Sequence, residues 1–164
     1  MVQYPEAQHR AQEAIDAVVG RDRFPNFEDR PALPIIDALI RETLRRAPAL
    51  PVDLPHGVTD DDIYEGYFIS KGSAILHDEV RFVNPMKFDP DRFLDANGQL
   101  TNDHSHLLVF GFGRRMCPGR HLADASLWSA MACMLAMFDF ARAKDAQGRE
   151  INIDDAEWSN GLTR

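Results

Sequence analysis

The amino-acid sequence predicts a mainly α-helical fold with small β hairpins, and three patterns along the chain support this prediction. Apolar residues recur at helical spacing in residues 5–19 and again in residues 34–47. Residues 118–138 form a longer, largely apolar stretch that also favours a helix. Two short runs rich in aromatic and β-branched residues lie on either side of Gly66, which is typical of a tight hairpin.

The first two predicted helices are bounded by glycine and proline. Gly20 closes the helical pattern of residues 5–19, and Pro34 and Pro48 bracket the second pattern. The three prolines of residues 48–55 predict an extended path there, because a residue that precedes proline is driven away from the helical region.

The stretch between the hairpin and the third helix has little periodicity. Residues 84–106 carry prolines, aspartates and an Asn-Gly turn, so we expect an irregular, packed meander. The apolar run of residues 127–138 is shorter than the about 20 residues that span a bilayer, and it is predicted to be a buried helix. Further on, Ile151 and Ile153 alternate with polar residues and predict a final strand.

Composition narrows the class of protein. The chain has 164 residues, of which 45% are apolar and 27% charged, as in ordinary globular proteins. Its net charge of −8 disfavours nucleic acid as a partner, because phosphate binding needs a basic surface. Two cysteines are too few for a disulfide scaffold, and no signal peptide is visible in the first residues. No internal repeat or low-complexity linker divides the chain, so residues 1–164 are predicted to form one structural unit.

The most informative segment is Phe-Gly-Phe-Gly-Arg-Arg-Met-Cys-Pro-Gly, residues 110–119. Its glycines, Gly113 and Gly119, permit positive φ and close approach of the backbone to a planar ligand. Arg115 offers a fork of donors for a carboxylate. Cys117 precedes a helix whose free amides favour thiolate over thiol. The simpler interpretation is that Cys117 is a small buried residue in a turn, which is common for a free cysteine.

The order Phe-x-x-Gly-x-Arg-x-Cys-x-Gly resembles the haem-binding loop of the cytochrome P-450 family, the haem-thiolate monooxygenases. The resemblance implies haem b (iron protoporphyrin IX) as cofactor, with Cys117 as the axial ligand of the haem iron. It also implies that Phe110 packs beside the ring and that Arg115 pairs with a haem propionate. Gly113 and Gly119 would let the loop lie close to the porphyrin.

A second group of residues agrees with this resemblance. Glu42 and Arg45 are neighbours on a predicted helix, and such pairs are most often exposed surface pairs. In the family, however, a Glu-x-x-Arg pair meets an arginine of a Pro-x-Arg-Phe segment, which here is Arg92. Glu42, Arg45 and Arg92 would then form a buried structural network that shapes the proximal side of the haem. His56 is a further candidate for a propionate, or else a solvated loop histidine.

The resemblance covers residues 5–161, which correspond to the C-terminal third of the family. We therefore expect a partial, proximal cytochrome P-450 fold, a C-terminal fragment without the distal helix and without one strand between Gly72 and His77. No catalytic residue is identified, because the distal residues of the family have no counterpart here. Full-length relatives are often anchored at the endoplasmic reticulum, and no such anchor is visible in this sequence.

The resemblance implies a monooxygenase that inserts one oxygen atom of O₂ into a small organic substrate, with electrons from an NADPH-dependent reductase. The alternative is a truncated, non-catalytic remnant that binds haem weakly or not at all. A generic helical regulatory domain would explain the helices but not the ordered loop. Zinc is disfavoured, because Cys117 and His121 have no second Cys/His pair at ligand spacing.

Overall fold

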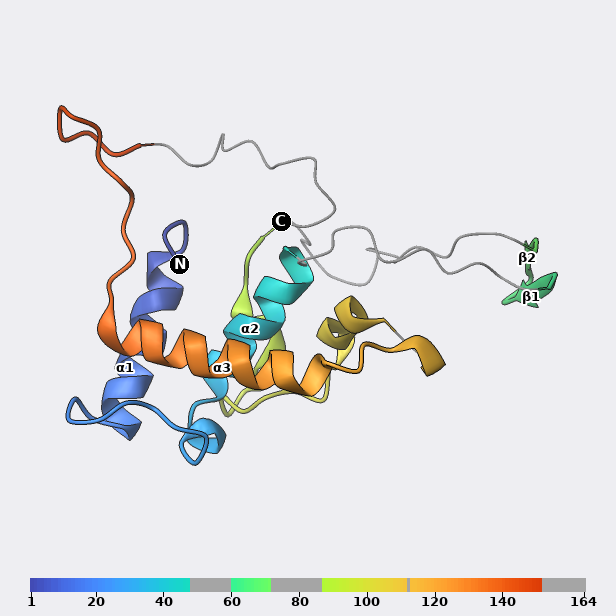
Figure 1. The fold of residues 1–164 in the computed structure, drawn as a ribbon, viewed down its shortest axis with the longest axis horizontal. Helices are drawn as coiled ribbons and strands as arrows, with labels where there is room; N and C mark the ends of the chain where they lie inside the picture. Colours follow the sequence, from blue (N-terminus) through green and yellow to red (C-terminus); the bar gives the residue numbers. More distant parts are fainter. Residues whose placement is uncertain (48–59, 72–86, 112, 152–164) are drawn as a thin grey trace.

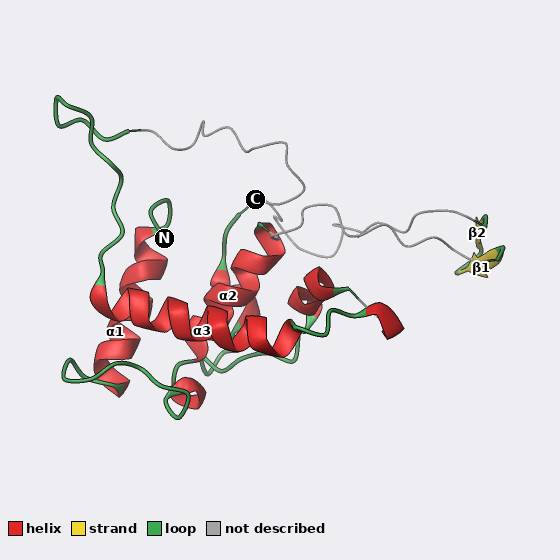
Figure 2. Cartoon of the chain, viewed as in Figure 1, coloured by secondary structure: helices red, strands yellow, loops and turns green. Residues whose placement is uncertain are grey.

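The computed structural model describes residues 1–47, 60–71, 87–111 and 113–151. Within them the fold is mainly helical with one small hairpin, which confirms the predicted class (Figure 2). The long helices are α1 (Pro5–Val18), α2 (Pro34–Arg46) and α3 (Arg120–Met137). Short 3₁₀ helices connect them: η1 (Arg30–Ala32), η2 (Pro90–Phe93), η3 (Ser105–Phe110) and η4 (Gly113–Arg115).

The first two helices begin where the sequence predicted. Pro5 and Pro34 occupy the first turns of α1 and α2, where a missing N–H costs no helical hydrogen bond. The last turn of α2 carries Arg45 and Arg46, whose charges suit the negative end of a helix. The prolines therefore mark the helix starts, because the first turn is where a helix tolerates proline.

The core lies where α3 crosses α1 and α2 (Figure 1). Trp128 of α3 is the largest fully buried side chain and is 1% exposed. The buried apolar residues around it come from all three helices and from the residue before α2: Ala7, Ala11, Ile15, Leu33, Ile35, Ile36, Leu39, Ile40, Ala132 and Leu135. Interdigitated apolar side chains of this kind supply most of the stability of a small helical unit.

The prediction of a buried helix over residues 127–138 is wrong for most of its surface. Trp128, Ala132 and Leu135 are buried, whereas Met134 and Met137 are 46% and 57% exposed. Only one side of α3 packs against α1 and α2, and within the described residues nothing covers the opposite side.

The hairpin forms as predicted from β1 (Asp62–Tyr64) and β2 (Tyr67–Ile69). The strands are antiparallel, with Ile63 opposite Phe68. Glu65 and Gly66 connect them with φ of 49° and 84°, the pair of positive values that a two-residue turn of the I′ type requires.

The meander is irregular, as predicted, and contains η2, η3 and an isolated bridge between Leu94 and Leu100. The predicted final strand is not found at Ile151, where the neighbouring Lys144 and Glu150 make only an isolated bridge. Three predictions fall outside the described residues: the strand position Ile153, the extended path of residues 48–55, and the missing strand between Gly72 and His77. No helix in the described part is both long and apolar enough to cross a membrane.

Candidate functional site

The cysteine loop is closed by its own backbone. The N–H of Cys117 donates to the carbonyl of Phe110 at 2.8 Å, and the N–H of Met116 donates to the carbonyl of Gly113 at 3.4 Å. Two glycines have the positive φ that the turn requires, Gly111 at 74° and Gly113 at 63°. The positive φ of Gly113 was predicted from the sequence, whereas that of Gly111 was not.

Gly119 does not have the predicted positive φ, because its φ is −83°. It is the N-cap of α3, so the helix begins at Arg120 and Pro118 lies in the turn before it. A Cβ added at Gly119 would lie 3.8 Å from the sulfur of Cys117. At that distance a Cβ would make an ordinary van der Waals contact with the sulfur, so neither a positive φ nor a steric clash requires glycine here.

Cys117 itself is exposed, which contradicts the interpretation of a small residue buried in a turn. The other free cysteine, Cys133, is half-buried, and its sulfur lies 3.9 Å from the carbonyl oxygen of Pro25. The accessible thiol is therefore the one that stands at the start of α3.

The structure brings Glu42, Arg45 and Arg92 together. Arg45 holds the fully buried carboxylate of Glu42 with two hydrogen bonds of 2.7 and 2.8 Å. The Nε of Arg92 lies 3.4 Å from the same carboxylate, and the backbone N–H of Asp89 donates to it at 2.8 Å. Both arginines also donate to the carbonyl of Lys87. Sharing one carboxylate and one carbonyl satisfies buried donors that would be costly to leave unpaired.

A second arginine of α2, Arg41, holds the segment that leads into the cysteine loop. Its Nη1 donates to the carbonyls of Thr101 and Asp103, both at 3.0 Å. Nearby, His106 of η3 is 8% exposed, and its Nδ1 has no hydrogen-bond partner. Burial, followed by the charge of Arg41, lowers the pKa of His106 from 6.5 to about 4. The imidazole is therefore neutral in the folded chain at neutral pH.

Arg30 connects α2 to α3. Its guanidinium donates to Asp124 of α3 at 2.8 and 2.9 Å and to Asp37 of α2 at 2.6 and 3.2 Å. It also lies 5.8 Å from the ring centre of Trp128. The hydrogen bonds to Asp124 and Asp37 raise the pKa of Arg30, although burial acts in the opposite direction.

The other predicted site residues are placed less completely. Phe110 ends η3 and is half-buried. The backbone of Arg115 belongs to η4, but its side chain is not among the described parts of the structure. His56 lies outside the described residues.

The donor set suits a metal that brings most of its own ligands. Within the described residues, no group of three His, Cys, Asp or Glu side chains could hold a bare metal ion. A single exposed sulfur beside a glycine matches an iron already held in a macrocycle, which needs one axial thiolate from the protein. The residues that are present therefore fit haem.

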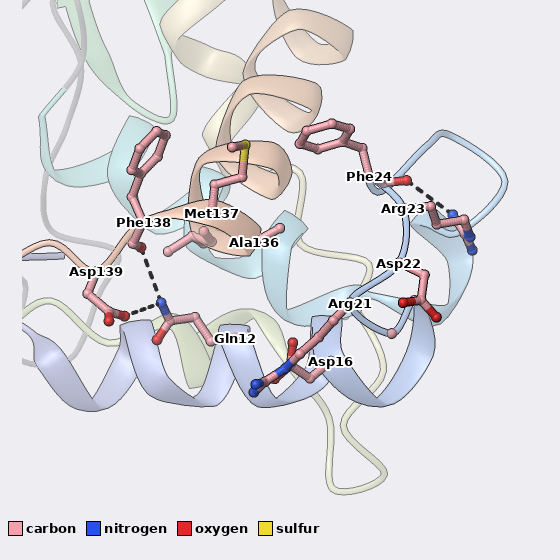
Figure 3. A pocket seen from close by; sticks show the side chains of 12 residues that line it. Gln12, Asp16, Arg21, Asp22, Arg23, Phe24, Ala136, Met137, Phe138 and Asp139 are labelled. Atoms are coloured by element: carbon pink, nitrogen blue, oxygen red, sulfur yellow. Dashed lines mark hydrogen bonds and ion pairs between the residues drawn. The ribbon is translucent and has the colours of Figure 1, made fainter.

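A pocket of about 520 Å³ lies at the far end of α3 from Cys117 (Figure 3). It is an open hollow between the end of α1, residues 20–24 and residues 135–139. At its edge the side-chain amide of Gln12 donates to the carbonyl of Phe138 at 3.2 Å and to the carboxylate of Asp139 at 2.8 Å. The cysteine loop does not contribute to this pocket.

Sequence reasoning missed the positions that hold the loop from outside, Arg30 and Arg41. Arg41 binds backbone carbonyls, and one partner of Arg30, Asp124, is 94 residues away, so no residue spacing predicts these contacts. The one available signal was Asp37, a lone acidic residue in the otherwise apolar stretch of residues 35–40. A buried acid in such a run requires a partner.

Known proteins contain the same sequence pattern. A sequence model of the family described as "Cytochrome P450" matches residues 1–158. The chain is 45% identical to the cytochrome P450 monooxygenase claR of Ampulloclitocybe clavipes over 98% of its own length and 31% of that relative. It is 44% identical to cytochrome P450 monooxygenase 98 of Postia placenta over 99% of its length and 33% of that relative. The chain thus spans about a third of the length of these relatives.

The match covers nearly the whole chain and includes both the cysteine loop and the Glu42 network. This chain belongs to the cytochrome P450 family.

Proposed function

We propose that this chain is the proximal, haem-binding part of a haem-thiolate monooxygenase, with Cys117 as the axial ligand of the iron. The observation that carries the proposal is the exposed sulfur of Cys117 at the start of α3 in a chain of this family. Haem held in this way supplies the activation of O₂ that allows one oxygen atom to enter a small organic substrate.

The residues of the loop would have separate roles. Cys117 binds the iron as a thiolate, and Phe110 packs near the sulfur and limits its contact with water. Gly119 places no side chain beside the sulfur, where a Cβ would be in van der Waals contact at 3.8 Å. Arg115 would balance the charge of a propionate, and His56 is the second candidate for that task.

The network around Glu42 would hold this loop in shape rather than take part in chemistry. It ties η2 to α2 through Arg45 and Arg92. Preorganisation of this kind fixes the protein ligand before the cofactor arrives, so that less ordering is needed on binding.

The relatives are named as monooxygenases, which favours an enzyme that takes electrons from an NADPH-dependent reductase. The second candidate is a haem-binding chain without catalysis. The uncovered side of α3 favours this alternative, because within the described residues Leu122, Met134 and Met137 are 74%, 46% and 57% exposed.

The two functions are separated by turnover in the presence of ¹⁸O₂. The chain, supplied with haem, a reductase and NADPH, is incubated with a panel of apolar organic compounds, and products are analysed for the heavy oxygen. A labelled product that is lost in Cys117→Ala and retained in Cys133→Ala supports the monooxygenase. Haem uptake without labelled product supports the non-catalytic alternative, and no haem uptake refutes both for this chain.

A further inference from the structure

The chain segments on both sides of the cysteine loop are attached to α2 by arginines. Upstream, Arg41 holds the carbonyls of Thr101 and Asp103. Downstream, Arg30 joins Asp37 of α2 to Asp124 of α3. The loop therefore lies between two attachments, and neither Arg41 nor Arg30 belongs to the cysteine-loop motif of residues 110–119.

The downstream attachment matters more, because the start of α3 has little local support. Its N-cap, Gly119, has no side chain to cap the free amides, and the first turn contains no acidic residue. The first turn instead contains Arg120, whose positive charge is unfavourable beside the positive end of a helix. Isolated helix ends of this kind fray, so the start of α3 depends on tertiary contacts.

Asp124 supplies such a contact at the right place. It is the fifth residue of α3, about 6 Å along the helix axis from Arg120. Its carboxylate receives two hydrogen bonds from Arg30, whose side chain is only 26% exposed. The same guanidinium also donates two hydrogen bonds to Asp37, so the arginine bridges two helices.

We propose that Arg30 is a positioning residue for the thiol of Cys117, acting through Asp124 to fix the start of α3 against α2. The inference rests on the proposed role of Cys117 as the iron ligand. Lysine cannot replace Arg30, because a single ammonium group cannot hold two carboxylates with four hydrogen bonds.

The first test needs no cofactor. Hydrogen–deuterium exchange is measured on the whole chain and on Arg30→Lys and Asp124→Asn. The matched control is Arg23→Gln, because Arg23 makes a two-fold pair with Asp29 near η1 and its hydrogen bonds do not reach α3. We expect the amides of residues 120–124 to exchange about fivefold faster in both variants, with α1 unchanged and the control equal to the parent.

The second test is spectroscopic and measures whether the sulfur of Cys117 is bound to the haem iron. With haem supplied, the protein is reduced and treated with carbon monoxide, and the share of the red-shifted, thiolate-type Soret band is measured. We expect this share to fall in Arg30→Lys and Asp124→Asn while total haem uptake is retained, and to stay unchanged in Arg23→Gln.

Several outcomes would overturn the inference. These are unchanged exchange at residues 120–124, faster exchange over the whole chain, or an equal loss of the thiolate band in the Arg23→Gln control. If the parent chain takes up no haem, the proposed function fails, but the exchange experiment still decides whether Arg30 holds the start of α3. The two failures are thereby distinguishable.

Discussion

The two sides of α3 have opposite surroundings. On one side Trp128, Ala132 and Leu135 are at most 2% exposed and pack against α1 and α2. Away from that side Leu122, Met134 and Met137 are 74%, 46% and 57% exposed, and the exposed Cys117 lies three residues before the helix begins. The residues that stabilise this chain are thus distinct from the exposed cysteine: α1, α2 and the buried side of α3 form the core, and Cys117 lies outside it.

The largest expected effect on stability comes from the Glu42 network, which ties η2 to α2. Replacing Glu42 by alanine leaves Arg45 and Arg92, with side chains 9% and 15% exposed, without their shared carboxylate. We expect a loss of about 3–5 kcal/mol in the free energy of unfolding, measured by urea unfolding followed by circular dichroism. Glu13→Ala, which removes an exposed acid of α1, is the control. Equal stability of the two variants would contradict a structural role for the network.

A matched pair of leucines tests the two sides of α3 directly. Leu135→Ala opens a cavity in the core and should cost about 2–5 kcal/mol. Leu122→Ala removes the same atoms from an exposed position and should change stability by no more than about 0.5 kcal/mol. Urea unfolding of the two variants under the same conditions provides the measurement. Similar losses in both would mean that the exposed side of α3 is covered in solution.

Mild acid should lower the stability of the folded chain through the buried imidazole of His106. The unfolded imidazole takes up a proton as the pH falls through 6.5, whereas the buried one resists protonation down to about pH 4. Stability is therefore lost as the pH falls between these values, by about 1–2 kcal/mol from pH 7 to pH 5. His106→Phe should make the pH dependence shallower over this range. An unchanged slope in that variant would show that other groups cause the acid sensitivity.

The smallest effect on stability is expected at the sulfur. Cys117→Ala removes an exposed thiol, so the free energy of unfolding should change by no more than about 0.5 kcal/mol. Thermal unfolding of the parent and the variant checks this. A large loss would mean that the thiol is part of the fold and that its removal cannot be used to isolate binding.

Much of this arrangement could be predicted from local sequence. Pro34, Gly20 and the hairpin turn at Gly66 act on their own backbone, so their effect is visible in the residues themselves. The meeting of Glu42 with Arg92 was inferred from the family motif, since fifty residues separate them. The buried side of α3 was harder to predict, because apolar residues occur all around the helix and do not indicate which side packs against α1 and α2. The bridge of Arg30 to Asp124 spans 94 residues, and the buried Asp37 indicates that a partner is needed but not that Arg30 also reaches α3.

We propose that Cys117 binds the haem iron and contributes little to the stability of the fold. The most direct measurement is the spectrum of the reduced, carbon-monoxide-treated protein, with haem supplied, for the parent, Cys117→Ala and Cys133→Ala. We expect a red-shifted, thiolate-type Soret band in the parent and in Cys133→Ala, and its complete loss in a folded Cys117→Ala. The same band in Cys117→Ala, or its loss in Cys133→Ala alone, would contradict the claim.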